Sequence, residues 1–481
     1  MSKEKTTLPS AICWFRQDLR ISDNPAFSHA IQEGSVLPIY ILDDKNALEH
    51  KMGGASRVWL HHSLNSLNQS LQGYLALYEG DALSIIMQLC SEYKITKIFW
   101  NRCYEPWRIK RDEDIKKELS QNGIHASSYN GSLLWEPWQV TKEDKTPYKI
   151  FTPFYQRGCQ NAPTPRAPLP QPDHFSLFKE NKFSYHLDQL KLLPHIPWHN
   201  KPCSYWDINE TAAHQRLTSF FKKDLSRYKK GRDFPAEGSV SRLSPYLHFG
   251  QISPHQIWQA IMYLEDNVNL QHFKSELAWR EFSYNLLYFN PTLPKENLQK
   301  KFNAFPWKAN LQNLVAWQKG LTGIPMVDAG MRELWQTGYM HNRVRMIVGS
   351  FLVKNLLLDW RHGEQWFWDC LFDADLANNS ASWQWVAGCG TDAAPYFRIF
   401  NPVTQGEKFD PDAQYIRQYI PEIKNLPNKY IFSPWEVPES VLKESKITLG
   451  VTYPKPIVDL KKSREDALMA FKKISLPCIL L

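Results

Sequence analysis

Short apolar runs alternate with amphipathic segments over the first third of the chain. Five of these runs predict strands: AICWF (11–15), VLPIYIL (36–42), YLALYE (74–79), TKIFW (96–100) and HASSY (125–129). The clearest amphipathic segment between them is SRVWLHHSLNSLNQSL, residues 56–71, which predicts a helix. Strands that alternate with helices are typical of a parallel, doubly wound α/β sheet.

The first predicted strand is not followed by the glycine-rich fingerprint of dinucleotide-binding sheets. The sequence after it is RQDLRISDNP, residues 16–25, which contains no glycine. Because the G-x-G-x-x-G turn lets the backbone approach a pyrophosphate, its absence argues against a Rossmann-type dinucleotide site here.

The character of the chain changes twice after the sheet. From about 136 to 205 it is rich in proline and irregular, as in QNAPTPRAPLPQPDHF, which predicts a long linker over a surface. Beyond 206 helical periodicity dominates and strand signals vanish, with no internal repeat. We therefore predict an N-terminal α/β domain (1–135), an interdomain linker (136–205) and a C-terminal all-helical domain (206–481).

Composition narrows the class of protein. A chain of 481 residues predicts two or three domains. A mean hydropathy of −0.47 and a charged start, MSKEKTTLPS, predict a cytoplasmic protein with neither a membrane span nor a signal peptide. The eight cysteines are scattered, as reduced thiols are, and predict neither disulfides nor a zinc site. A net charge of +8 permits an anionic partner without demanding one.

Two helical segments carry candidate functional residues. In SELAWREF (275–282), helical spacing places Glu276, Trp279 and Arg280 on one face. In MHNRVRM (340–346), Asn342 and Met346 share a face while Arg345 points elsewhere, which suits a helix serving two ligands. The plainer alternatives are an exposed ion pair beside a core tryptophan and a solvated arginine-rich helix.

The run FDADLANNSASWQW, residues 372–385, combines acids, amides and large rings. Asp373 and Asp375 lie two apart, but no histidine stands at ligand spacing, so we predict no metal site. Acids can accept hydrogen bonds from ring N–H groups or a ribityl chain, and the Asn379 amide can serve a ring nitrogen in either protonation state. Those are the requirements of an isoalloxazine.

A loop rich in small residues, YKKGRDFPAEGSVSRLSPYLHFG (228–250), adds a candidate anion site. Ser239, Ser241 and Ser244 lead into a helix predicted to begin near Pro245. Hydroxyl groups at a helix N-terminus could hold a pyrophosphate.

Several long motifs together resemble the photolyase/cryptochrome family. They are WFRQDLRISDNPA, GRDFPAEGSVSRLS, SELAWREF, TGIPMVDAGMREL, MHNRVRM and DADLANNSASWQW…GTDAAPYFRIFNPVTQGEKFD. The resemblance spans nearly the whole chain and is densest from 228 to 420. Within the family the sequence is most similar to class I cyclobutane pyrimidine dimer (CPD) photolyases.

The resemblance implies FAD, folded into a U inside the helical domain and active as FADH⁻. Arg345 would pair with Asp373 beside the flavin, Asp375 would contact the ring edge and ribityl chain, and Asn379 would face flavin N5. The residues that would hold the phosphates are Tyr228, Ser241, Arg242, Leu243 and Ser244. An electron-hopping chain would run from the flavin to the surface through Trp383, Trp360 and Trp307, because indole is oxidisable.

The resemblance further implies light-dependent repair of DNA by a monomer, a deoxyribodipyrimidine photo-lyase. Excited reduced flavin would donate an electron to a thymine dimer flipped out of the duplex. Glu276 would hydrogen-bond the dimer, for which it should be protonated or become so, as burial favours, while Trp279 and Trp385 stack on its bases. Arg280, Asn342 and Met346 would complete the pocket. The expected phosphate contacts are Arg232, Arg343 and Lys408.

Alternatives within and beyond the family stay open. A (6-4) photolyase is expected to carry histidines at positions 342 and 346, and a single-strand-preferring one glutamine at 346 and tyrosine at 279; this chain has neither pattern. Plant and insect cryptochromes are expected to replace Asn379. A light sensor that binds a partner protein stays an alternative, and a flavin oxidoreductase that works in the dark is disfavoured.

A second, antenna chromophore is expected in the α/β domain. The segment WNRCYEPWRIKRD (100–112) departs from the folate-binding pattern, because Trp107 and Arg108 replace its Asn-Glu pair. Folate, deazaflavin, flavin or no antenna all stay open.

Overall fold

The computed structural model describes residues 8–179, 183–393, 395–396 and 398–475. Residues 1–7, part of the charged start, lie outside the described residues. So does Cys478, one of the eight cysteines. The N-terminal third forms a sheet of six strands: β1 (Ala11–Phe15), β2 (Ser35–Leu42), β3 (Ala76–Glu79), β4 (Lys97–Asn101), β5 (His125–Tyr129) and β6 (Ser176–Leu177). The five predicted strands are confirmed within two residues.

The sheet is parallel and doubly wound, as predicted. Its strand order is β3-β2-β1-β4-β5, and the two-residue β6 pairs with β2. The central strand β1 is buried along its whole length, with Ala11, Cys13 and Phe15 in one hydrophobic cluster and Ile12 and Trp14 in another. A strand of this kind needs cover on both faces.

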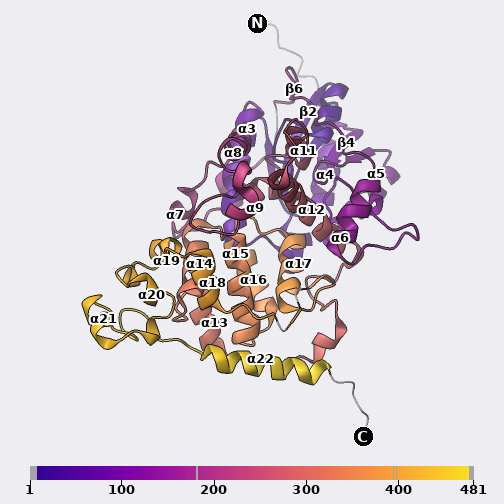
Figure 1. Ribbon diagram of the computed structural model, residues 1–481. Coiled ribbons are helices and arrows are strands. Elements are labelled where there is room, and N and C mark those ends of the chain that lie inside the picture. The colour runs from indigo at the N-terminus through magenta and orange to yellow at the C-terminus, as the bar shows by residue number, and fades with distance from the viewer. Residues whose placement is uncertain (1–7, 180–182, 394, 397, 476–481) are drawn as a thin grey trace.

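Helices cover the two faces of the sheet (Figure 1). The Trp14 face packs against α4 (Ala82–Tyr93) and α5 (Pro106–Gln121). The Phe15 face packs against α1 (Pro25–Ala30) and α3 (Gly54–Ser70), and a short α2 (Asp44–Ala47) follows β2. The helix α3 begins two residues before the predicted segment and ends one residue before its predicted end.

The cluster on the Phe15 face continues into the helical part of the chain. It includes residues of α8 (Glu210–Lys223), α11 (Pro254–Met262) and α12 (Val268–Phe289). Trp59 of α3 shows the join, since its indole N–H donates to Gln251 at 2.9 Å and its ring meets Tyr246 edge-on at 5.1 Å. The sheet and the helical part therefore share one core, and the boundaries at 135 and 205 stay a prediction.

The crevice between β1 and β4, where ligands of doubly wound sheets bind, is occupied by the chain itself. Arg16 donates to Asp112 at 2.5 Å, and the amide of Asn101 donates to Asp18 at 2.6 Å. Gly250 closes the crevice from the helical side. Its φ is +68°, and a Cβ there would lie 2.2 Å from the carbonyl oxygen of Gln17, so only glycine fits.

The proline-rich segment is packed more deeply than a linker draped over a surface. Val140, Phe151, Phe154 and Cys159 are buried in one cluster with side chains of α12. Short helical stretches carry them: α6 (Phe151–Pro153) and the π-helical turn Phe154–Cys159. Residues 164–173 belong to no helix or strand and are half-buried to exposed, and the segment ends near α7 (Asn200–Cys203).

The remaining chain is helical, and in the part that the structure describes no named strand follows β6. A second large core gathers side chains of α14, α15, α16, α17, α19 and α22. The helices not yet given are α9 (Tyr228–Gly231), α10 (Ser244–His248), α13 (Leu311–Gln318), α14 (Pro325–Thr337), α15 (Asn342–Ser350), α16 (Trp360–Cys370), α17 (Leu376–Ala387), α18 (Pro402–Phe409), α19 (Gln414–Tyr419), α20 (Asn428–Ile431), α21 (Glu439–Glu444) and α22 (Leu460–Ser475).

Three further findings concern the described residues only. The seven cysteines among them are free thiols, six of them buried. No group of three or more His, Cys, Asp or Glu side chains within the described ranges could hold a metal ion. None of the helices in those ranges has the length and apolar character needed to cross a bilayer.

Candidate functional site

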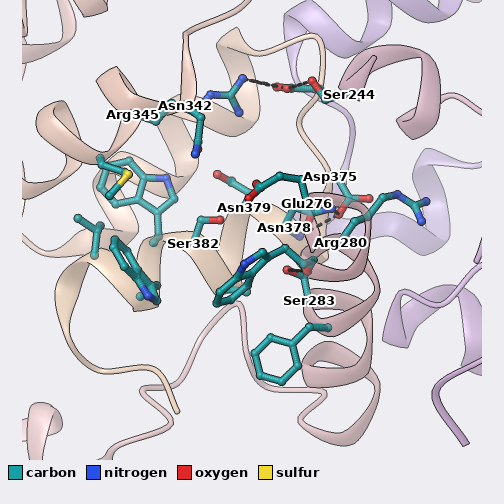
Figure 2. Close-up of a pocket in the computed structure, with 18 of the residues that line it drawn as sticks. Ser244, Glu276, Arg280, Ser283, Asn342, Arg345, Asp375, Asn378, Asn379 and Ser382 are labelled. Carbon is teal, nitrogen blue, oxygen red and sulfur yellow. Dashed lines mark hydrogen bonds and ion pairs between the residues drawn. The ribbon is translucent and has the colours of Figure 1, made fainter. Parts of the chain in front are cut away.

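A cavity of about 700 Å³ opens between α12, α15, α17 and the loop before α10. Its walls come from segments up to 165 residues apart, because lining residues run from Tyr228 to Ala393. Figure 2 shows side chains of α12, α15 and α17 around one shared space. Seventeen of the predicted site residues line it: Tyr228, Arg232, Ser241, Leu243, Ser244, Glu276, Trp279, Arg280, Asn342, Arg343, Arg345, Met346, Asp373, Asp375, Asn379, Trp383 and Trp385.

The helix α12 contributes one wall. It begins after Asn267, whose side chain accepts from the backbone N–H groups of the first turn. Glu276, Trp279, Arg280 and Ser283 follow at helical spacing and all line the cavity, as the sequence predicted for the first three.

Asp373 joins two other walls of the cavity. Its carboxylate accepts two bonds from Arg345, at 3.0 and 2.9 Å, and one from the Ser244 hydroxyl at 2.6 Å. Burial works against the charge of Arg345, but the nearby Asp373 outweighs burial and raises the pKa of the guanidinium. The predicted pair of Arg345 with Asp373 is present.

Asp375 is a buried carboxylate with a full set of partners. It caps α17 by accepting from the backbone N–H of Asn378 at 2.8 Å, and it also accepts from the Tyr284 hydroxyl. His248 Nδ1 lies 3.5 Å away. Burial would raise the pKa of Asp375, but the nearby His248, followed by Arg280, lowers it to about 2. This wall is therefore anionic at any neutral pH.

Asn379 lies one turn into α17 and is buried. Its amide nitrogen donates to the backbone oxygen of Glu364 at 3.0 Å, which fixes the orientation of the side chain. Figure 2 shows it between Asp375 and Ser382 on the cavity wall. A fixed amide of this kind can present one defined polar atom to a ligand.

Two ion pairs span the more exposed side of the cavity. Arg232 pairs with Glu276, and Arg343 pairs with Asp233 at 2.5 Å. Glu276, which we expected to be protonated or to become so, is half-buried in the structure and faces the Arg232 cation. Burial acts against the charge of Arg232, yet Glu276 prevails and raises the pKa of Arg232.

Burial and the positive charge on this side of the cavity lower the pKa of His341. Burial, followed by the charges of four arginines, lowers the pKa of this histidine to about 3, so it is neutral. The four are Arg242, Arg232, Arg343 and Arg345.

Four predicted residues do not line the cavity. Arg242 adopts a left-handed backbone with φ of +51°, and its guanidinium lies 5.3 Å from the Tyr339 ring. Lys408 is exposed on α18, with its ammonium 5.1 Å from the ring of Phe409. Trp360 and Trp307 lie in the helical core beyond the cavity. The serine that the sequence grouped with Ser241 and Ser244, Ser239, is buried outside the cavity.

The three tryptophans of the predicted chain lie around α16. The ring of Trp383 packs so closely on this helix that a Cβ at Gly363 would lie 2.1 Å from Trp383 Cη2. Trp360 begins the same helix and is fully buried. Next to half-buried Trp307, the backbone N–H of Lys308 donates at 2.8 Å to Leu357, just before that helix.

Sequence reasoning missed several residues of the site. His248 and Tyr284 contact Asp375, and Asp392 also lines the cavity. Phe151 lies behind Trp279, with the two ring centroids 3.8 Å apart and the planes within 9° of parallel. His248 stands inside a quoted motif and could have been found there, whereas nothing local marks Phe151 as part of a site.

Two family descriptions match this chain. Residues 11–173 match the family described as DNA photolyase, and residues 273–473 match the FAD binding domain of DNA photolyase. Among curated relatives, the deoxyribodipyrimidine photo-lyase of Agrobacterium fabrum is 45% identical, over 96% of this chain and 98% of the relative. Cryptochrome-2 of Arabidopsis thaliana is 37% identical, over 94% of this chain and 77% of the relative.

Solved structures agree with these matches. A bacterial class III photolyase from Agrobacterium tumefaciens superposes with a TM-score of 0.93 at 44% identity, covering 98% of this chain and 99% of the other. An archaeal photolyase from Sulfolobus tokodaii, solved with two FAD molecules, gives a TM-score of 0.78 at 30% identity over 96% and 99% of the two chains.

Proposed function

The chain belongs to the photolyase/cryptochrome family, and from that premise we propose that it is a light-dependent DNA repair enzyme, a deoxyribodipyrimidine photo-lyase that splits cyclobutane pyrimidine dimers. The observation that carries the proposal is one cavity with two chemically different sides. Asp375 and Asn379 are buried and form what we call the buried side, while Trp279, Trp385 and Glu276 are half-buried and form what we call the half-buried side.

The buried side fits FAD. Asp373 and Asp375 can accept from sugar hydroxyls and ring N–H groups, and the fixed amide of Asn379 suits a ring nitrogen. Bound and reduced, the flavin would supply an electron under light. The residues we propose for the phosphates are Tyr228, Ser241, Arg242, Leu243 and Ser244. Among these, Arg242 reaches no cavity wall, so its contribution would be to the local positive charge.

The half-buried side fits a damaged base pair drawn out of duplex DNA. Flipping costs a few kcal/mol, and less at a lesion that already stacks poorly. Stacking on Trp279 and Trp385 would return roughly 1–3 kcal/mol per base. Because the two quantities are comparable, only the lesion would gain enough to stay in the cavity. Asn342 and Met346 would complete its walls.

The cations of this side would hold the DNA backbone. Arg232, Arg343 and Lys408 are the proposed phosphate contacts, which give affinity without sequence information. Two of them are already paired, Arg232 with Glu276 and Arg343 with Asp233. Binding of DNA would draw Arg232 toward a phosphate and release Glu276 toward the substrate.

Glu276 is the proposed catalytic residue of the chain itself. Released from Arg232, its carboxyl could take up a proton and donate it in a hydrogen bond to the carbonyl edge of the dimer. Arg280, which lies beside it and is charged, would support negative charge there. Trp383, Trp360 and Trp307 would carry electrons inward from the surface to restore the reduced state.

The finer assignments remain proposals. We predicted class I, and the similarity to a class III photolyase keeps the class open between the two without altering the proposed substrate. An antenna chromophore would lie in the α/β part. There Arg108 pairs with Glu105 and lies 4.6 Å from the Trp107 ring, so the two residues that depart from the folate pattern are already engaged. A monomer is the expected state.

The test is repair by the purified, reduced protein of an oligonucleotide with one thymine dimer, followed by the recovery of thymine absorbance. We expect recovery in blue light and none in darkness. With the flavin bound and reduced, absence of recovery in light would overturn the proposal and favour a cryptochrome-type sensor. Repair of a (6-4) product instead would overturn the substrate.

Two variants locate the activity in the cavity. Glu276→Ala should keep FAD and most DNA affinity yet repair fewer dimers per absorbed photon. The double variant with Arg232→Ala separates this effect from that of leaving Arg232 without its partner.

Trp385→Ala should weaken dimer binding roughly 5- to 150-fold, the equivalent of one stacked base. Trp335→Ala is the control, because Trp335 is 59% exposed and lies outside this cavity.

A further inference from the structure

We propose that Phe151 is a positioning residue for the substrate: it holds the Trp279 ring in the plane in which a damaged base stacks. The inference rests on the proposed function and adds to it a residue from outside the helical part. Phe151 belongs to the proline-rich segment, more than 120 residues before Trp279.

The contact between the two rings is face to face. Their centroids lie 3.8 Å apart, and their planes are within 9° of parallel. Phe282 packs against the edge of Trp279 at 5.8 Å. One face of the indole is thus covered, and Trp279 lines the cavity. A base that stacks on Trp279 in the cavity would extend the aromatic stack formed by Phe151 and Trp279.

Phe151 is itself held firmly. The ring of Tyr155 lies nearly parallel to that of Phe151, with centroids 5.8 Å apart and planes 16° apart. The backbone N–H of Phe151 donates to the carboxylate of Asp392 at 2.8 Å, and Asp392 lines the cavity. The backing ring is therefore tied to the loop after α17.

A held ring binds more tightly than a free one. The second side-chain torsion of tryptophan is broad, so an unbacked indole samples many orientations. Ordering such a side chain on binding costs affinity, whereas a ring already in place avoids that cost. Losing Phe151 should therefore weaken dimer binding about 3- to 10-fold.

The experiment compares three variants of the full-length holoprotein in darkness, where binding is separate from repair. Phe151→Leu keeps an apolar side chain but loses the flat face, and Phe151→Tyr restores it. Phe154→Leu is the matched control, because Phe154 is also buried in the same cluster but its described ring contacts are with Tyr148 and Phe282. The affinities for dimer-containing and undamaged oligonucleotides, the FAD content and the melting temperature are measured for each.

We expect Phe151→Leu to lose dimer affinity 3- to 10-fold while its affinity for undamaged DNA and its FAD content match those of Phe154→Leu. Phe151→Tyr should recover the parent affinity. At saturating dimer, repair per photon should stay within twofold of the parent. If Phe151→Leu and Phe154→Leu lose dimer affinity equally, or Phe151→Leu loses none, the positioning role is wrong. If the parent protein itself binds dimer and undamaged DNA alike, the proposed function fails instead.

Discussion

Single residues of the cavity owe their chemistry to partners far away in the chain. Asp375 stays ionised because His248, Tyr284 and the start of α17 surround it, and Asp373 is fixed by Ser244 and Arg345. The sequence marked the acids because they stand together in one motif. It could not mark Arg232 as the partner of Glu276, because the two are 44 residues apart on different elements.

The buried carboxyl group of Glu364 should make the stability of the protein depend on pH. It accepts a bond from the Ser380 hydroxyl and its backbone oxygen holds Asn379, but burial, only partly offset by Ser380, raises its pKa from 4.5 to about 7. Between pH 4.5 and 7 the folded protein keeps a proton that the unfolded chain releases. Stability should therefore fall as the pH rises through this window and level off above it.

Glu364→Gln removes this titration while keeping the shape and the acceptor for Ser380. The variant should unfold like the parent near pH 4.5 and be more stable at pH 8, by up to about 3 kcal/mol. Denaturant unfolding at both pH values checks this. Glu281, whose pKa burial also raises to about 7, titrates in both proteins and cancels in the difference. An equal difference at the two pH values would refute the argument.

At the scale of elements, the sequence predicted what periodicity controls. All five predicted strands formed, since each is a short apolar run bounded by polar turns, and α3 formed with its amphipathic pattern. The pattern failed in the proline-rich segment. Strand β6 has two residues, and α6 with its π-helical turn is held by contacts with α12 rather than by a repeating pattern. Phe151 was missed for that reason.

The helix α16 would carry the tryptophans through which electrons reach the flavin. Trp383 packs on it and Trp360 begins it, so it would connect the flavin side of the cavity with half-buried Trp307. Trp307→Phe should block light-driven reduction of oxidised flavin, because phenylalanine is not oxidised under these conditions. Repair after chemical reduction should be unaffected.

Absorbance of the flavin during illumination with an external reductant follows the reaction. Trp138→Phe is the control, since Trp138 is 46% exposed and packs on Tyr104 and Tyr288, away from α16. Photoreduction of Trp307→Phe at the parent rate would show that electrons enter by another route.

For the whole molecule, the fold class and the order of its parts were predictable, whereas the way the parts join was not. The pattern of apolar positions separates a first third that forms the sheet from a remainder that forms helices. The cluster that contains Phe15 and Trp59 nevertheless also contains Phe220, Ile257 and Phe273, and such long-range packing leaves no local signal.

This shared core predicts that residues 1–205 cannot fold alone. The fragment would expose the apolar side chains of the Phe15 cluster that α8, α11 and α12 cover in the whole protein. It should bind a hydrophobic dye and unfold without a sharp transition, and adding residues 206–481 should restore both flavin binding and cooperativity. A sharp unfolding transition for the fragment alone would support an independent domain.

The core shared by the sheet and the helical part also affects how the chain folds during its synthesis. A ribosome releases the sheet first, but the last side chain that α8, α11 and α12 add to its core is Leu277, about 70 residues after residue 205. At ~5–20 residues per second, the newly made part of the chain would wait roughly 4–14 s before these three helices could cover its apolar side chains. During that interval the nascent chain is a substrate for holding chaperones, and slower translation between 205 and 277 should lower the yield of folded protein.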